Sequence, residues 1–125
     1  MLANAKATSG FAVPDTAEAK RFYGETLGLE VAVLSEENGV MALKLTGGDV
    51  FLYRKADFTP ATYTILNFEV DDIDAAVDEL TSRGVSLERY DGFDQDERGI
   101  ARGPGPMIAW FKDPAGNILS VLQQP

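Results

Sequence analysis

Two stretches of the chain repeat each other 57 positions apart, and this repeat constrains the fold more than any other feature. The first stretch runs from Val13 to Leu29 and the second from Val70 to Val85. Each contains a β-branched strand end, an acidic turn, a helical stretch and a glycine after the helix. A repeat of this length indicates two copies of one structural unit. We therefore expect any chemistry to take place between the copies.

Both expected helices carry start and stop signals. Asp15 is predicted to cap the first helix, with Glu18 three residues later completing a capping box, and Asp72 to cap the second. Gly28 supplies the stop of the first helix. The apolar residues at helical spacing are Ala19, Phe22, Tyr23 and Leu27 in the first copy and Ile73, Ala76, Val77 and Leu80 in the second.

The rest of each copy reads as short strands separated by turns. In the first copy the expected strands are 8–13, 31–35, 40–45 and 50–54, and in the second they are 64–70, 85–90, 107–112 and 118–122. Residues 91–105 form the least regular segment, and 113–117 read as a hairpin turn. We expect a single domain over 1–125, with one module at about 5–55, a linker at 56–62 and a second module at about 63–124.

Charge and composition exclude several classes of function. The net charge of −9 disfavours a nucleic-acid partner and favours a cationic small molecule in a cleft. The absence of Cys excludes disulfides, thiolate nucleophiles and sulfur-ligated metals. No apolar run is long enough for a bilayer, and residues 1–10 lack the pattern of a secretory signal. We expect a cytoplasmic location and no membrane partner.

Three motifs give the chain a family resemblance. They are Val-Pro-Asp at 13–15 followed by Phe-Tyr and Leu-Gly-Leu at 22–29, Asn-Phe-Glu-Val-Asp-Asp-Ile-Asp-Ala-Ala at 67–76, and Asp-Pro-Ala-Gly-Asn at 113–117. With these motifs the chain resembles the vicinal oxygen chelate superfamily of glyoxalase, bleomycin-resistance and extradiol-dioxygenase proteins. The resemblance implies an α+β fold, in which two paired β-α-β-β-β modules form a curled half-barrel sheet with helices on the convex side. It also implies a homodimer.

The resemblance also implies where a metal would bind. In the metalloenzymes of this superfamily, His, Gln or Glu side chains on matched strands hold a divalent ion, and these positions transfer to Thr8, Ile65, Ser120 and the neighbourhood of Phe51. Alternation along 64–70 independently places Ile65 and Asn67 on the concave face, opposite the apolar residues that face the helix. The transferred residues are not ligands for a divalent cation, and the chain has no His. We therefore expect no metal, no cofactor and no catalytic residue.

Carboxylates leave one alternative open for a metal. Asp49 and Glu69 are the nearest acidic residues in sequence, and they are candidate ligands for a hard ion that keeps several waters. Acidic residues at strand and turn positions are more often simply solvated.

A concave face without metal ligands is instead suited to an organic ligand in an apolar pocket with a few polar groups. The candidate ligand-binding residues are Thr8, Phe51, Tyr53, Ile65, Asn67, Trp110, Ser120 and Arg102. Trp110 suits stacking on a planar or cationic ligand, or a place in the core. Arg98 and Arg102 flank a glycine-rich segment and are interpreted either as holding an acidic group or as solvated.

The sequence thus predicts a metal-independent small-molecule binding protein of the glyoxalase and bleomycin-resistance type, with the ligand in the concave cleft. The competing hypothesis is a glyoxalase- or lyase-like enzyme that uses carboxylates or a substrate-borne metal, with Tyr53 or Glu69 in acid–base work. A third is a module whose groove is filled by its own side chains.

Overall fold

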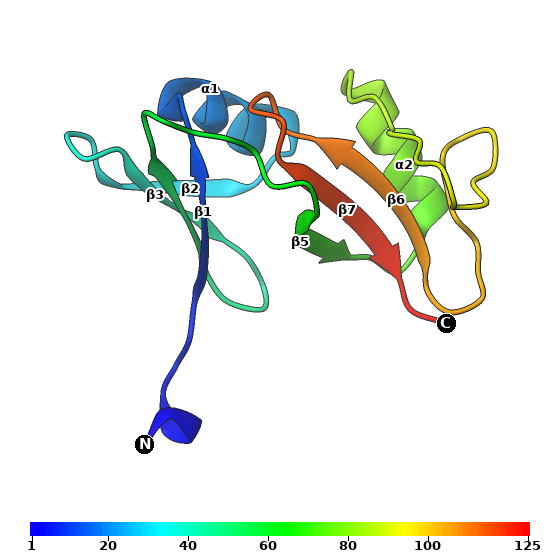
Figure 1. The fold of residues 1–125 in the computed structure, drawn as a ribbon, viewed down its shortest axis with the longest axis horizontal. Coiled ribbons are helices and arrows are strands. Elements are labelled where there is room, and N and C mark those ends of the chain that lie inside the picture. Colours follow the sequence, from blue (N-terminus) through cyan, green and yellow to red (C-terminus); the bar gives the residue numbers. More distant parts are fainter. The chain divides into compact units, whose positions relative to one another are not determined.

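The computed structural model describes residues 1–125. The chain divides into two compact units, Met1–Thr59 and Pro60–Pro125, which are described one at a time. Each unit has one mixed sheet and one main helical segment, so the predicted α+β class is confirmed (Figure 1). None of the helices has the length and the apolar character that crossing a lipid bilayer requires.

The first unit contains a four-stranded sheet in the order β1-β4-β3-β2. Strand β1 (Ser9–Val13) runs parallel to β4 (Val50–Arg54), which pairs antiparallel with β3 (Val40–Lys44). Strand β3 pairs antiparallel with β2 (Glu30–Ser35). The helical segment joins β1 to β2, and a short turn of 3₁₀ helix, η1 (Leu2–Asn4), precedes the sheet. The predicted β-α-β-β-β order of this unit is confirmed.

The helical segment of the first unit changes its winding partway along. It begins as α1 (Thr16–Lys20), where the Asp15 carboxylate accepts a hydrogen bond of 3.1 Å from the Glu18 N–H, confirming the predicted N-cap. It continues as a π-helix, η2 (Arg21–Thr26), and the Leu27 N–H donates to the Phe22 carbonyl five residues back. Gly28, at φ 75°, ends it as predicted. The apolar spacing did not predict the wider π turns.

The core of the first unit lies between this helical segment and one face of the sheet. Phe11, Met41 and Leu52 share that face by strand register, and each is at least nine-tenths buried. Tyr23 of η2 is fully buried, with its ring centroid 5.8 Å from that of Phe11. Hydrophobic burial therefore fixes which face of the sheet the helix covers.

The second unit has a three-stranded sheet in the order β5-β7-β6. Strand β5 (Thr64–Glu69) runs parallel to β7 (Ile118–Gln123), which pairs antiparallel with β6 (Met107–Lys112). Helix α2 (Ile73–Ser82) packs on β6 and β7. Its predicted N-cap is confirmed, because the Asp72 carboxylate accepts a hydrogen bond of 3.1 Å from the Ala75 N–H. The helix buries Ile73, Val77 and Leu80.

The hairpin between β6 and β7 has the turn that its sequence predicts. The Asp113 carboxylate accepts hydrogen bonds from the N–H groups of Ala115 and Asn117, at 3.0 and 2.9 Å. Gly116 has φ 94°, a backbone conformation that glycine adopts without strain. The side chain of Asp113 is buried, so the turn carries its own hydrogen-bond acceptor.

The prediction of a strand at 85–90 is wrong. Only one backbone hydrogen bond joins this segment to the sheet, from the Glu88 N–H to the Trp110 carbonyl at 2.8 Å. The side-chain amide of Gln95 bonds two other backbone groups of the segment, accepting from the Tyr90 N–H and donating to the Glu88 carbonyl. These backbone groups at Glu88 and Tyr90 are therefore satisfied by a side chain instead of a partner strand.

Candidate functional site

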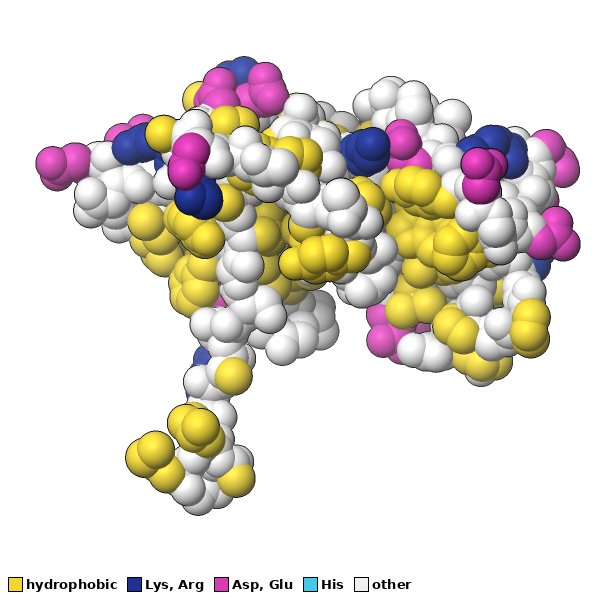
Figure 2. Space-filling view, viewed as in Figure 1, with side chains coloured by type: hydrophobic (Ala, Val, Ile, Leu, Met, Phe, Trp, Pro, Cys, Tyr) yellow, Lys and Arg dark blue, Asp and Glu magenta, His cyan; other side chains and the backbone are white.

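Three of the predicted site residues belong to the first unit, on or beside the sheet face that the helix does not cover, which we call its helix-free face. Phe51 lies in register between Gly10 and Ala42 and is half-buried. Tyr53 follows on the same face of β4 and is 45% exposed. Thr8 precedes β1 and is exposed. The Phe51 ring thus lies between two small residues. Hydrophobic side chains also gather over the strands of each unit (Figure 2).

Three more of the predicted residues form a single row across the sheet of the second unit. Asn67 of β5 is paired with Ser120 of β7, and Ser120 is paired with Trp110 of β6. Paired residues project to the same side of a sheet, which here is the side away from α2. The Ser120 hydroxyl donates a hydrogen bond of 2.5 Å to the Asn67 side-chain oxygen. This row is called the Asn67–Trp110 row below.

The remaining predicted residue on β5 stands outside this row. The register between β5 and β7 shifts between Thr64 and Leu66, so that Ile65 has no partner on β7. Such an irregularity bends the strand and breaks the alternation on which the sequence argument relied. Ile65 is half-buried, and its place was predicted from spacing alone.

Two aromatic residues that the sequence analysis did not select pack against Trp110. The Tyr90 ring meets the Trp110 ring edge-on at 5.5 Å, and the Phe93 ring lies at 4.7 Å with a tilt of 58°. They reduce the exposure of Trp110 to 7%, while Phe93 itself stays 55% exposed. No spacing pattern linked them to Trp110, because both lie in the segment that lacks regular structure.

The hydroxyl of Tyr90 is buried without a hydrogen-bond partner. Burial disfavours the phenolate, and the nearby Glu88 carboxylate adds to that effect, so the pKa of Tyr90 is raised. A neutral phenol remains a hydrogen-bond donor over the whole physiological pH range. The group therefore provides a donor beside Trp110 for an acceptor that the chain itself does not supply.

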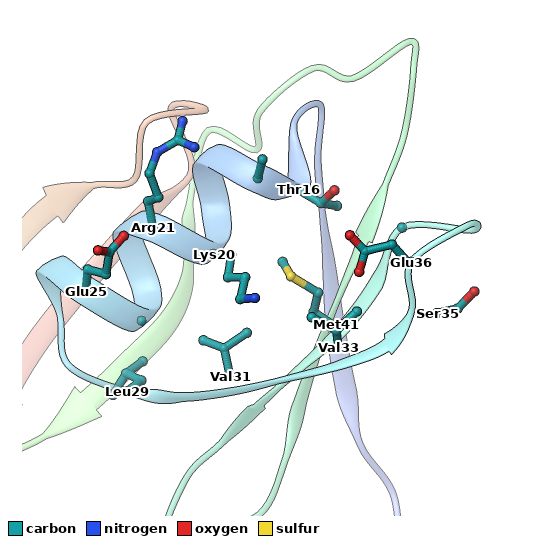
Figure 3. A pocket seen from close by; sticks show the side chains of 13 residues that line it. Thr16, Lys20, Arg21, Glu25, Leu29, Val31, Val33, Ser35, Glu36 and Met41 are labelled. Carbon is teal, nitrogen blue, oxygen red and sulfur yellow. The ribbon is translucent and has the colours of Figure 1, made fainter.

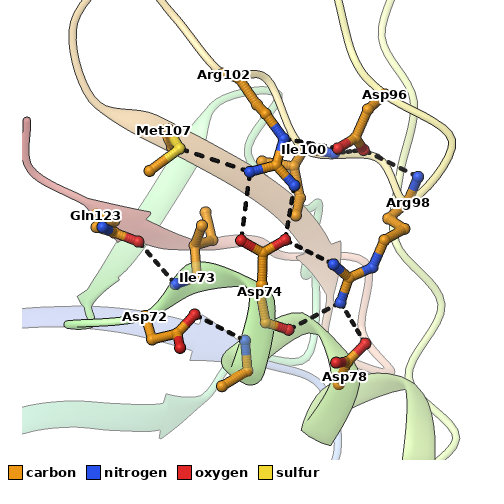
Figure 4. A network of polar contacts seen from close by, with 11 residues as sticks. Asp72, Ile73, Asp74, Asp78, Asp96, Arg98, Ile100, Arg102, Met107 and Gln123 are labelled. Atoms are coloured by element: carbon orange, nitrogen blue, oxygen red, sulfur yellow. Dashed lines mark hydrogen bonds and ion pairs between the residues drawn. The ribbon is translucent and has the colours of Figure 1, made fainter.

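Arg102 makes ion pairs within the second unit, together with Arg98 (Figure 4). Arg102 lies 2.6 Å from Asp74 and 2.9 Å from Asp96. Arg98 lies 2.6 Å from Asp74 and also pairs with Asp78. Both guanidinium groups therefore have carboxylate partners in the chain, and they tie the irregular segment to α2. Sequence spacing did not predict this network, because the arginines lie 24 and 28 residues from Asp74.

These ion pairs favour the charged forms of the acidic residues. The hydrogen bond from Arg102 lowers the pKa of Asp74 despite some opposing desolvation, and the charges of both arginines lower it further. Burial opposes the ionisation of Asp96, but hydrogen bonds from the Ile100 N–H, the Arg102 side chain and the Arg98 N–H outweigh it and lower its pKa. Both carboxylates are thus held ionised by their partners.

The side chains at the positions where the superfamily's metalloenzymes hold a metal do not fit a divalent cation. Thr8, Phe51, Ile65 and Ser120 offer two hydroxyl groups and two hydrocarbon side chains, and the Ser120 hydroxyl is engaged with Asn67. Neither unit contains a group of three or more His, Cys, Asp or Glu side chains placed to hold a metal ion. Of the carboxylates considered, Asp49 pairs with Lys44 at 2.7 Å.

Comparison with known proteins identifies the family. Residues 7–121 match the model of the Glyoxalase/Bleomycin resistance protein/Dioxygenase superfamily. No curated protein matches the chain. Among solved structures it is similar to TnmS3, an antibiotic binding protein from Streptomyces sp. CB03234, with 26% identity, a TM-score of 0.70 and 98% of each chain covered.

Two further structures share the fold at lower identity. A glyoxalase family protein from Enterococcus faecalis has a TM-score of 0.69 at 22% identity, covering 98% of this chain and 99% of its own. Lactoylglutathione lyase from Agrobacterium tumefaciens has a TM-score of 0.66 at 24% identity, covering 96% of this chain and 93% of its own. The sequence match and the shared fold together make the chain a member of the glyoxalase/bleomycin resistance protein/dioxygenase superfamily.

Proposed function

We propose that the chain is a metal-independent small-molecule binding protein whose ligand lies against the Asn67–Trp110 row. One observation carries the proposal, namely that an aromatic ring, a hydroxyl and an amide lie in register across the helix-free face of the second unit. Because Ser120 donates to the Asn67 oxygen, the exposed Asn67 amide keeps its N–H donors for a ligand. The unpartnered Tyr90 hydroxyl adds a donor beside the ring.

The chemistry of these residues favours binding without a metal. Hydroxyl, amide and aromatic groups recognise an organic ligand by hydrogen bonding and stacking, and none of them replaces the imidazole or carboxylate ligands of a divalent ion. Phe51 and Tyr53, with Thr8 nearby, offer a comparable apolar surface in the first unit. Arg102 is already neutralised by Asp74 and Asp96, so in this proposal it holds the irregular segment in place beside Trp110.

The ligand that we propose is organic and cationic. A net charge of −9 attracts cations, and the ring of Phe93, which is 55% exposed beside Trp110, offers an aromatic face that stabilises them. A relative at 26% identity is an antibiotic binding protein, which supports capture of an antibiotic-like molecule as the activity. We further propose that the protein is a homodimer, which analytical ultracentrifugation tests. We also propose that it acts in the cytoplasm and binds neither nucleic acid nor membrane.

A fluorescence titration tests the binding proposal, because Trp110 is the only tryptophan of the chain. A panel of cationic antibiotics that includes bleomycin is added to the full chain. We expect a saturable change in Trp110 emission for at least one compound, and about fivefold weaker binding after Asn67→Ala, which removes the amide donors. Asn38→Ala, in the exposed turn before β3, is the control and should leave the affinity unchanged.

Two outcomes would contradict the proposal. The first is a panel that produces neither a fluorescence change nor a shift in melting temperature, which is expected of a module filled by its own side chains. The second is turnover of methylglyoxal and glutathione in the presence of added Ni²⁺ or Zn²⁺, which would favour the glyoxalase-like enzyme.

A further inference from the structure

The first unit has a groove on the opposite side of its sheet from Phe51 and Tyr53, between the helical segment and β2 (Figure 3). Its volume is about 600 Å³, within the range of small-molecule sites. Leu29, Val31 and Val33 line it at alternate positions of the chain, and Met41 lies beside Val33 in strand register. Val33 is 39% exposed although it faces the helix, so the apolar lining is open to solvent.

The helical wall of the groove combines a cation with a glycine. Lys20 ends α1 and points from the helix toward β2, above Val31 (Figure 3). No carboxylate of the chain forms an ion pair with it. Gly24 follows in η2, where an added Cβ would lie 3.6 Å from a methyl group of Val31. The π-helix, a form that is frequent at functional sites, lies along the same wall.

The second unit has a related groove in which the chain supplies the counter-charge itself. It lies beside α2 and is lined by Val77, Asp78 and Arg98 among others. Arg98 reaches into the acidic surface of α2 and pairs with Asp74 and Asp78. At the repeat offset of 57 positions, Asp78 corresponds to Arg21 and Val77 to Lys20. The helix surface that is acidic in the second unit is therefore basic in the first, and no carboxylate of the chain forms an ion pair with Lys20 or Arg21.

Two glutamates limit where an anion can lie in the groove. Glu25 and Glu36 line its two ends, with Lys20 between them (Figure 3). A carboxylate near either end would meet a like charge, whereas one near Lys20 would meet an opposite charge over apolar side chains. Arg21 also lines the groove, but its side chain points away from Val31 (Figure 3). The arrangement around Lys20 suits one negative charge attached to a hydrocarbon body.

We propose that this groove binds an apolar monocarboxylate, with its carboxylate at Lys20 Nζ and its hydrocarbon on Leu29, Val31 and Val33. The site lies on the other face of the sheet from Phe51 and Tyr53, and the proposed ligand has the opposite charge to the one proposed for the Asn67–Trp110 row. An experiment that contradicts one of the two proposals therefore leaves the other unaffected.

An amide NMR titration of the full chain with octanoate tests this site. We expect saturable shifts at 20–25 and 30–35, and none with octylamine or inorganic phosphate, which carry only the chain or only the charge. Lys20→Gln should weaken octanoate binding about fivefold, as expected for a partly exposed ion pair. Gly24→Leu should abolish binding by filling the groove. Lys6→Gln removes a cation elsewhere and should change nothing.

The proposal is overturned if octanoate gives no saturable shift, or if its affinity is the same in the Lys20→Gln variant. Equal binding of octylamine, or shifts confined to Phe51, Tyr53 or the second unit, would overturn it as well. If the Gly24→Leu variant does not fold, the comparison of octanoate affinity between the Lys20→Gln and Lys6→Gln variants remains decisive. Both of these changes are conservative and lie at exposed positions.

Discussion

The two units have the same order of strand, helix and strands, but the contacts that hold the helix differ between them. In the first unit the helix is held through apolar contacts such as Tyr23 on Phe11, and a groove remains beside Lys20. In the second unit Arg98 and Arg102 bind the first turns of α2 to the segment before β6. A few charged positions of the repeat thus determine whether the helix is bridged or left open on one side.

The helix-free faces of the two units differ in how far their aromatic side chains are covered. Tyr53 of the first unit is 45% exposed, whereas Trp110 of the second is 7% exposed because Tyr90 and Phe93 pack on it. The segment that carries these two residues is also the one that the arginines hold. Ion pairs on one face of the second unit and aromatic packing on the other therefore belong to one connected arrangement.

The largest difference between the units is expected for aromatic truncation. Trp110→Ala should lower the free energy of unfolding by about 3–5 kcal/mol, because a nearly buried ring is lost. Tyr53→Ala should lower it by less than about 1 kcal/mol, since that ring is largely solvated. Urea unfolding followed by circular dichroism measures both values. Equal losses would show that the two faces are packed alike.

A smaller effect, confined to the second unit, is expected from breaking the arginine network. Asp74→Asn removes the charge that both arginines share, so the irregular segment should detach more often from α2. We expect faster hydrogen exchange at Ala101 and Ile108, whose N–H groups bond to each other's carbonyls, and unchanged exchange in β2–β4. Asp57→Asn, which breaks an exposed pair with Lys55, is the control. Unchanged exchange at Ala101 would contradict this role of the network.

Acid should loosen the same segment before it affects the first unit. The pKa values of Asp74 and Asp96 are lowered in the folded chain. At Asp74 the main cause is the hydrogen bond from Arg102, and at Asp96 hydrogen bonds outweigh the opposing effect of burial. Their contribution to stability is therefore complete well above the ordinary value of 3.8, and is lost as the pH falls through the lower folded values.

Trp110 emission, recorded between pH 7 and pH 2, reports this loosening. The red shift that accompanies exposure of the ring should begin at a higher pH in the Asp74→Asn variant than in the unmodified chain. Coincident curves would show that the pH dependence arises elsewhere.

The smallest effect concerns the first unit alone. Gly24→Ala should raise the free energy of unfolding by about 0.5–1 kcal/mol, because alanine favours helical structure and the added methyl group has room beside Val31. Gly47→Ala, in a turn with open space around it, should produce a smaller change. Thermal unfolding of both variants compares them. Destabilisation by Gly24→Ala would indicate that η2 needs glycine at this position.

Local signals in the sequence predicted much of this architecture. Asp15 and Asp72 cap their helices and Asp113 organises its hairpin, because in each case a side chain satisfies backbone groups only two to four residues away. The Asn67–Trp110 row was accessible in part, since alternation along 64–70 gives the face of Asn67.

Contacts between distant residues could not be predicted in this way. Tyr90 and Phe93 meet Trp110, and the arginines meet Asp74, only after the irregular segment has folded. The shift of register that isolates Ile65 likewise depends on the pairing of two strands about fifty residues apart.

Gln95 has a consequence for how members of such a family can diverge. Its side-chain amide accepts from the Tyr90 N–H and donates to the carbonyls of Glu88 and Gly99, so it takes the place that an adjacent strand would otherwise fill at Glu88 and Tyr90. A single mutation at this position would leave three main-chain groups needing new partners, namely the Tyr90 N–H and the carbonyls of Glu88 and Gly99. In a relative without this glutamine, the freed groups at Glu88 and Tyr90 would be open to pairing with an adjacent strand, while the caps and the hairpin of the repeat would stay intact.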